Sequence, residues 1–98
     1  VGRKPVHAYV AAVLRAMQDG DRDVELVARG NSMRTAIDTA EICRRRNGNI
    51  AGNLPPEMFN RGVEIGTEEI EMEDSVRILS YVKIHLEGIG EMPDDSEE

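Results

Sequence analysis

The sequence predicts an α/β fold of the two-layer α+β type, in which helices cover one face of a β-sheet. Two segments repeat apolar residues at helical spacing, and three others are β-prone or alternate between apolar and polar residues. They follow one another as helix, strand, helix, strand and strand. Because 98 residues can enclose only one modest core, we expect one domain over residues 1–88 and an acidic, disordered tail over residues 89–98.

The first helix and the first strand have clear boundaries. Residues 5–18 carry apolar side chains at spacings of three and four, beginning with Pro5 and ending before Gly20. Proline suits a first helical turn and glycine suits a helix end. Residues 24–28 are β-prone and place Val24, Leu26 and Ala28 on one face.

A second apolar stripe begins at Met33 and predicts a second helix that ends in three arginines, residues 44–46. Asn31 or Ser32 is available as its N-cap. Cations at its last turn complement the helix dipole, and Asn47-Gly48 fits its C-cap.

The second half predicts a long connection followed by a hairpin. Residues 47–60, rich in Asn, Gly and Pro, are predicted to form a loop. Residues 63–72 and 76–86 are predicted to form two antiparallel strands, long enough to project from a small body. Residues 87–98 are polar and acidic, and we expect them to be disordered.

Charge is distributed unevenly along the chain. A net charge of −7 at pH 7 is the wrong sign for a general polyphosphate binder. The net charge is nevertheless +3 over residues 1–46, −5 over residues 47–90 and −5 over residues 91–98. A basic N-terminal half joined to an acidic C-terminal half can still present one positive face.

Other classes of function have little support. Cys43 has no partner for a disulfide and is interpreted as a small buried hydrophobe. His7 and His85 lack companions at metal-ligand spacing. No apolar run reaches the roughly 18 residues that cross a bilayer. We therefore expect a non-enzymatic, cytoplasmic protein with no cofactor, metal, small-molecule substrate or membrane partner.

Three blocks of residues, in this order, resemble the Alba family of small archaeal chromatin and RNA-binding proteins. They are Gly2-Arg3-Lys4-Pro5-Val6 followed by Tyr9-Val10, then Ala28-Arg29-Gly30, then Ala36-Ile37-Asp38-Thr39-Ala40-Glu41-Ile42. The resemblance is close over about residues 2–46 and extends to the terminal hairpin by shape only.

The resemblance implies a βαβαββ fold, similar to the C-terminal domain of translation initiation factor three, that forms a homodimer. The first strand is largely absent from this sequence, and Val1-Gly2 is interpreted as its end. The implied function is sequence-independent binding of double-stranded DNA, RNA or both by a chromosome-associated protein, with further assembly of dimers left open.

The resemblance assigns Arg3 and Lys4 to the basic pair near the nucleic-acid backbone, and Arg29 to the family's Arg-Gly loop. Asn31 and Arg34 complete the predicted nucleic-acid-binding set. Lys4 is the predicted modification site, because Arg3 replaces the lysine that is acetylated in many relatives. A second set of candidates is Arg44, Arg45, Arg46 and Arg77.

The hairpin departs from the family pattern because it is acidic instead of basic. Six carboxylates stand against Arg77, namely Glu64, Glu68, Glu69, Glu71, Glu73 and Asp74. Their alternation with apolar residues is typical of a solvated strand face, and a duplex groove would repel them. The alternative function is therefore a protein-interaction or ribonucleoprotein subunit whose acidic hairpin meets a basic partner.

Overall fold

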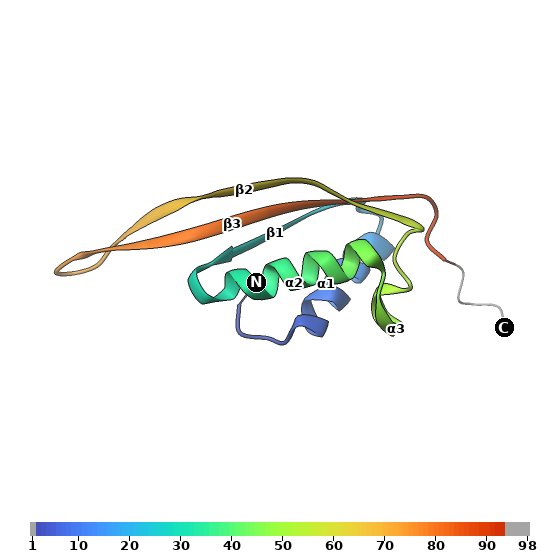
Figure 1. Cartoon of the computed structure of the whole chain (residues 1–98), viewed down its shortest axis with the longest axis horizontal. Helices are drawn as coiled ribbons and strands as arrows, with labels where there is room; N and C mark the ends of the chain where they lie inside the picture. The colour runs from blue at the N-terminus through green and yellow to red at the C-terminus, as the bar shows by residue number, and fades with distance from the viewer. Residues whose placement is uncertain (1, 94–98) are drawn as a thin grey trace.

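The computed structural model describes residues 2–93, which form a β-sheet with helices on one face (Figure 1). The elements are α1 (Val6–Gln18), β1 (Asp23–Arg29), a 3₁₀ turn (Gly30–Ser32), α2 (Met33–Arg45), α3 (Gly48–Ala51), β2 (Glu57–Glu71) and β3 (Val76–Ile89). The predicted two-layer α/β fold is confirmed. The strand predicted to precede α1 is not seen within the described residues, and Val1 lies outside them.

β3 is the central strand of the sheet, and it pairs antiparallel with β1 on one side and β2 on the other. β1 ends at Arg29, opposite Tyr81, whereas the hairpin of β2 and β3 continues beyond that point. We call residues 67–80 the arm. It projects past the helices at the left of Figure 1 and gives the molecule its elongated outline of 60 × 23 × 20 Å.

The core lies between the sheet and the helices. Alternate residues of β3 are buried against it, namely Val82, Ile84 and Leu86. They meet Val10, Val13 and Met17 of α1 and the small residues Ala36, Ala40 and Cys43 of α2. Cys43 is buried as predicted, and burial raises the pKa of its thiol to about 12. The thiol therefore stays protonated and unreactive near neutral pH.

The predicted loop over residues 47–60 was wrong at both of its ends. Residues 48–51 form α3, and β2 begins at Glu57. The strand's start was missed because a β-bulge between Asn60 and Gly62 interrupts the alternation of side chains. Met58 is buried and pairs with Gly88 ahead of the bulge.

The ends of α2 and β3 also differ from the predictions. The left-handed residue that ends α2 is Arg46, with φ of 55°, instead of the predicted Asn47-Gly48. β3 continues to Ile89 because Glu87 still pairs with both Asp23 and Phe59. The predicted disorder is therefore wrong for residues 87–89, while residues 94–98 of the predicted tail lie outside the described residues.

The tight packing at Gly88 provides a test of the core. A Cβ at Gly88 would lie 2.9 Å from Pro55 Cγ and 3.0 Å from Met17 Sδ. We expect Gly88→Ala to lower the free energy of unfolding by about 1–3 kcal/mol, because overpacking shifts its neighbours. Gly62→Ala is the control, since nothing lies within 4 Å of a Cβ there. Equal urea midpoints for both variants would contradict this packing.

Candidate nucleic-acid interface

The basic pair Arg3-Lys4 is held in place by the side chain of Tyr9. The Tyr9 hydroxyl accepts hydrogen bonds from the backbone N–H of Gly2 at 2.6 Å and of Lys4 at 3.1 Å. Because Tyr9 belongs to the first turn of α1, these bonds fold the N-terminal segment back onto that helix. Both basic side chains are left exposed to solvent.

A third hydrogen bond joins this segment to the turn after β1. Ser32 Oγ donates to the carbonyl oxygen of Gly2 at 3.4 Å. Ser32 stands at the N-cap position of α2, but its hydroxyl makes this contact and no capping bond. The bond holds Arg3 and Lys4 beside the turn that follows Arg29.

Arg29 ends β1 and points to the outer face of the sheet, away from the helices. There its guanidinium forms a fork with Glu68 of β2: Nε contacts Oε1, and Nη2 donates to Oε2 at 3.2 Å. The fork raises the pKa of Arg29 and lowers that of Glu68, mainly through the hydrogen bond itself. Both side chains remain partly exposed, at 50% and 37%.

The predicted nucleic-acid-binding residues therefore lie at one end of the body, where β1 ends and α2 begins. They are Arg3, Lys4, Arg29, Asn31 and Arg34. Asn31 is exposed in the 3₁₀ turn. Arg34 is exposed in the first turn of α2, and its Nε lies 3.8 Å from Asp38 Oδ2. Within residues 2–93, neither Arg3 nor Lys4 has an ion pair with a carboxylate.

The arginines at the far end of α2 form a separate group, about 15 Å along the helix from Arg34. Arg44 and Arg45 pair with Glu41, at 2.7 and 3.9 Å. Arg46 turns inward and donates to the carbonyl oxygens of Gly52 and Leu54, at 2.8 and 3.1 Å. It thus ties the segment after α2 to the body and presents little charge to solvent.

Arg77 lies far out on the arm, about 13 Å along β3 from Tyr81, and does not join either group. The carboxylates of the hairpin divide between its two faces. Glu64 accepts a hydrogen bond from the Tyr81 hydroxyl at 2.9 Å on the outer face, where Glu68 also lies. Glu69 and Glu71 point to the opposite face, since they pair with Ile78 and Val76.

The outer face of the sheet carries two further pairs of polar side chains. His85 Nε2 lies 2.8 Å from Asp23 Oδ1, and Arg61 pairs with Glu87 at 2.6 Å.

In the part of the chain that the structure describes, no group of three or more His, Cys, Asp or Glu residues could hold a metal ion. No helix there is long and apolar enough to cross a membrane.

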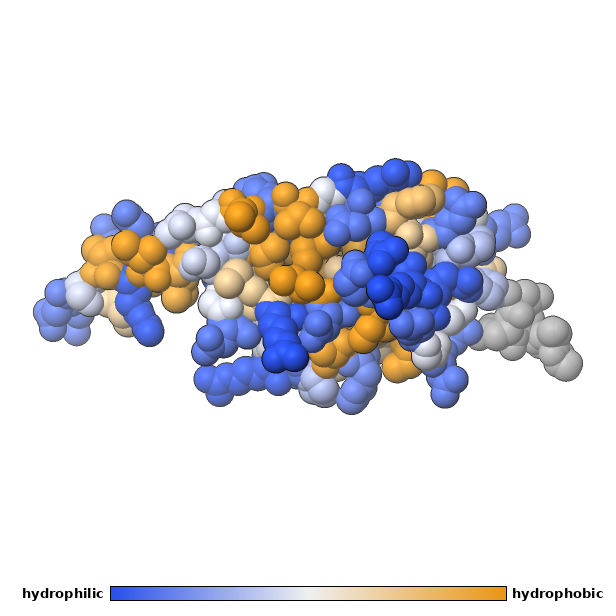
Figure 2. All heavy atoms as spheres, in the orientation of Figure 1, coloured by the Kyte–Doolittle hydropathy of each residue, from blue (hydrophilic) through white to orange (hydrophobic). Residues whose placement is uncertain are grey.

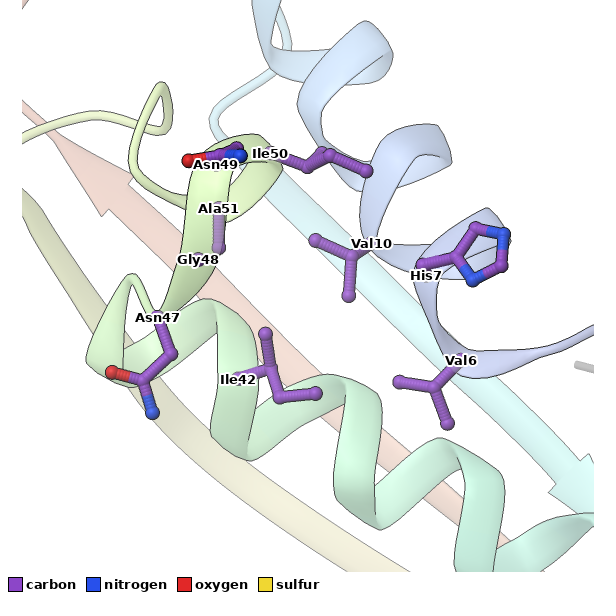
Figure 3. A pocket seen from close by; sticks show the side chains of 9 residues that line it. All are labelled: Val6, His7, Val10, Ile42, Asn47, Gly48, Asn49, Ile50 and Ala51. Carbon is purple, nitrogen blue, oxygen red and sulfur yellow. The ribbon is translucent and has the colours of Figure 1, made fainter.

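A half-open groove of about 400 Å³ lies between α1, α2 and α3. Figure 3 shows the side chains of Val6, Val10, Ile42 and Ile50 pointing into it, with His7 and Asn47 at the rim. Its lining contains no Asp, Glu, Lys or Arg. The groove is therefore unsuited to a phosphate group.

Apolar side chains are exposed on the face of the hairpin that the helices only partly cover. Val63 and Ile65 pair with the buried Ile84 and Val82 and therefore share their face, yet Ile65 is 77% exposed. Ile78 of the arm and Ile37 of α2 are also exposed, at 66% and 49%. Figure 2 shows apolar residues over the arm and over the hairpin base and α2. We call Ile37, Val63, Ile65 and Ile78 the apolar band.

Comparisons with known proteins agree on one family. Residues 1–53 match the Alba family. The chain is 36% identical over 86 residues to DNA/RNA-binding protein Alba 1 of Archaeoglobus fulgidus, which covers 88% of this chain and 89% of that protein. The chain belongs to the Alba family.

Two further comparisons extend this result. The chain is 36% identical over 87 residues to DNA/RNA-binding protein Alba of Methanocella arvoryzae, which covers 88% of this chain and 83% of that protein. The solved structure of Alba from Thermoplasma volcanium superimposes with a TM-score of 0.72 at 29% identity, over 89% of this chain and 94% of that one. The resemblance stated from three blocks of sequence is confirmed.

Sequence reasoning missed three residues that organise this end of the Alba fold. Tyr9 stood within a family block, but no role was predicted for its hydroxyl. Asn31 or Ser32 was predicted to cap α2; Ser32 stands at the N-cap position, but its hydroxyl bonds the carbonyl oxygen of Gly2. Glu68 lies 39 positions from Arg29, and only the strand register, which sequence spacing does not specify, brings the two together.

Removing the hydroxyl oxygen of Tyr9 tests whether this side chain holds the N-terminal segment in place. Tyr9→Phe removes the hydroxyl that accepts two backbone hydrogen bonds, each worth about 1 kcal/mol. We expect heteronuclear NOE values for residues 2–4 to fall, and the thermal midpoint to fall as well. Tyr81→Phe is the control, because its hydroxyl bonds Glu64 on the outer face. Unchanged NOE values in Tyr9→Phe would show that other contacts hold the segment.

Proposed function

We propose that this protein binds DNA, RNA or both through phosphate contacts made by Arg3, Lys4 and Arg29, acting as a non-enzymatic homodimer. The two relatives named above are DNA/RNA-binding proteins, which supports nucleic acid as the ligand. Contacts to phosphates position a protein on nucleic acid but carry no sequence information. The binding proposed here is therefore independent of sequence.

The observation that carries the proposal is the clasp made by Tyr9 and Ser32. It holds two exposed cations, Arg3 and Lys4, on the same end of the body as Arg29. Each cation that neutralises a phosphate releases condensed counterions, and cations at one end of the body can contact the same polyanion together. An overall charge of −7 does not prevent this, because the surplus acids of the folded domain lie mainly on the hairpin.

Lys4 is also the proposed modification site. It is the exposed lysine of the basic end, and acetylation would remove one of the charges that the clasp presents. The proposed location is the cytoplasm, in association with the chromosome.

The apolar band supports the homodimer. Ile65 and Ile78 are large β-branched residues left exposed on the helix-facing side of the hairpin, and Ile37 of α2 is exposed as well. Val63 and Ile65 are neighbours on this face of β2, and exposed apolar patches on a small domain mark association sites. A second copy that covers this band would present two basic ends on one particle.

The phosphate contacts are tested by removing the clasped cations. We expect Arg3→Ala with Lys4→Ala to weaken binding to duplex DNA and structured RNA. The slope of log affinity against log salt should also become shallower by about 1.8 for each subunit that contacts a duplex. The control is Arg15→Ala with Arg61→Ala, which removes the same net charge. Arg61 pairs with Glu87, which lies opposite Asp23 at the start of β1, whereas Arg29 is at the end of β1. Equal losses of affinity in the two double variants would contradict the assignment of Arg3 and Lys4 to the phosphate contacts.

The homodimer is tested by placing a charge in the apolar band. Ile65→Glu should raise the dimer dissociation constant by about 100-fold or more, because a carboxylate would be buried without a partner. Sedimentation equilibrium measures this directly. Ile70→Glu is the control, since Ile70 is in the same strand on the opposite face. A monomeric wild-type protein would contradict the proposal, as would an unchanged dimer in Ile65→Glu.

One observation favours a different function. The arm carries exposed carboxylates beside exposed Ile70, Met72, Val76 and Ile78. Such a surface suits a basic protein partner, as in a ribonucleoprotein, better than a nucleic-acid groove. Wild-type protein that binds neither duplex DNA, structured RNA nor single strands at low salt, yet co-purifies with a basic protein, would favour this second function.

A further inference from the structure

The ion pair of Arg29 and Glu68 spans the whole width of the sheet. Arg29 is the last residue of β1 and pairs with Tyr81 of β3, whereas Glu68 in β2 pairs with Leu79 of β3. The two side chains therefore meet over the central strand, on the outer face. They make two contacts, Nε with Oε1 and Nη2 with Oε2.

This two-pronged contact uses the atoms with which arginine grips a phosphate. A guanidinium fork matches the two oxygens of a carboxylate and two oxygens of a phosphate equally well. While Glu68 is in place, both of these Arg29 donors are occupied. Phosphate can contact them through the fork only after the carboxylate has left.

The surroundings allow that exchange. The pair is 50% and 37% exposed, so water and a polyanion can reach it, and exposed pairs of this kind are weak. Lys83 also lowers the pKa of Glu68 through its charge, so a displaced carboxylate keeps a second cation nearby. Glu64 does not replace Glu68 as the partner of Arg29, because Glu64 accepts a hydrogen bond from the Tyr81 hydroxyl.

We propose that Glu68 is a built-in competitor for the phosphate position at Arg29, and that it sets the affinity of this end of the molecule for nucleic acid. The inference rests on the proposed function. It makes Glu68 a specificity-determining residue: a ligand reaches the Nε–Nη2 edge of Arg29 only where its phosphates outcompete a tethered carboxylate. A sparsely charged ligand contacts Arg3 and Lys4 without the two-pronged contact to Arg29.

Two substitutions in adjacent residues separate competition from net charge. Glu68→Gln and Glu69→Gln each remove one negative charge, but only Glu68 contacts Arg29, and Glu69 points to the opposite face. At low salt we expect Glu68→Gln to bind a duplex DNA and a structured RNA about 2- to 5-fold more tightly than Glu69→Gln for each subunit that contacts the ligand. Adding Arg29→Ala to each variant should abolish the difference.

A second variant leaves the net charge unchanged. Glu68→Asp draws the carboxylate back by one methylene and should give part of the gain in affinity. Thermal midpoints of the three variants should stay near that of the wild type, since the pair is exposed. Equal affinities for Glu68→Gln and Glu69→Gln, or a gain that persists with Arg29→Ala, would overturn the competition.

The two proposals fail in different ways. If Arg3→Ala with Lys4→Ala weakens binding while Glu68→Gln matches Glu69→Gln, the proposed function stands and the role of Glu68 is wrong. If neither wild type nor Glu68→Gln binds any nucleic acid, the proposed function fails, and the competition falls with it.

Discussion

The pairing of β3 with both β1 and β2 is the constraint on which the rest of the molecule depends. Alternate residues of a strand point to opposite faces, so the register that buries Val82, Ile84 and Leu86 also directs Tyr81, Lys83 and His85 outward. The same register lets Arg29 and Glu68 meet across the sheet. A slip of one residue would expose the core and separate that ion pair.

Charge has three different fates in this fold. Some cations form hydrogen bonds within the protein, as Arg46 does with two carbonyl oxygens. Others are neutralised by a nearby acid, as Arg29 and Arg44 are. Arg3 and Lys4 belong to a third class, because backbone hydrogen bonds fix their positions while their side chains remain exposed. Net charge counts all three classes alike and is therefore a poor guide to the affinity of one face for a polyanion.

Much of the fold could be predicted from the sequence, because it depends on local periodicity. α1, α2, β1, the hairpin and their order along the chain follow from apolar spacing, whereas the short helix α3 was predicted as loop. The start of β2 could not be predicted, since the bulge near Gly62 shifts the alternation on which strand prediction depends. Arg46 was also beyond reach, because a left-handed arginine is disfavoured locally and is retained here with hydrogen bonds to residues 52 and 54.

The candidate site was less predictable than the fold because its decisive contacts join distant residues. Arg29 was identifiable from its block, but whether its guanidinium is available depends on Glu68, 39 residues later. That dependence also changes how the acidic arm is understood. Carboxylates near the tip of the arm would repel a duplex groove. At the base of the arm, Glu68 instead holds Arg29, the arginine proposed to bind phosphate. In the proposed competition, the acidic hairpin and the basic body are two parts of one binding surface, connected by the ion pair of Arg29 and Glu68.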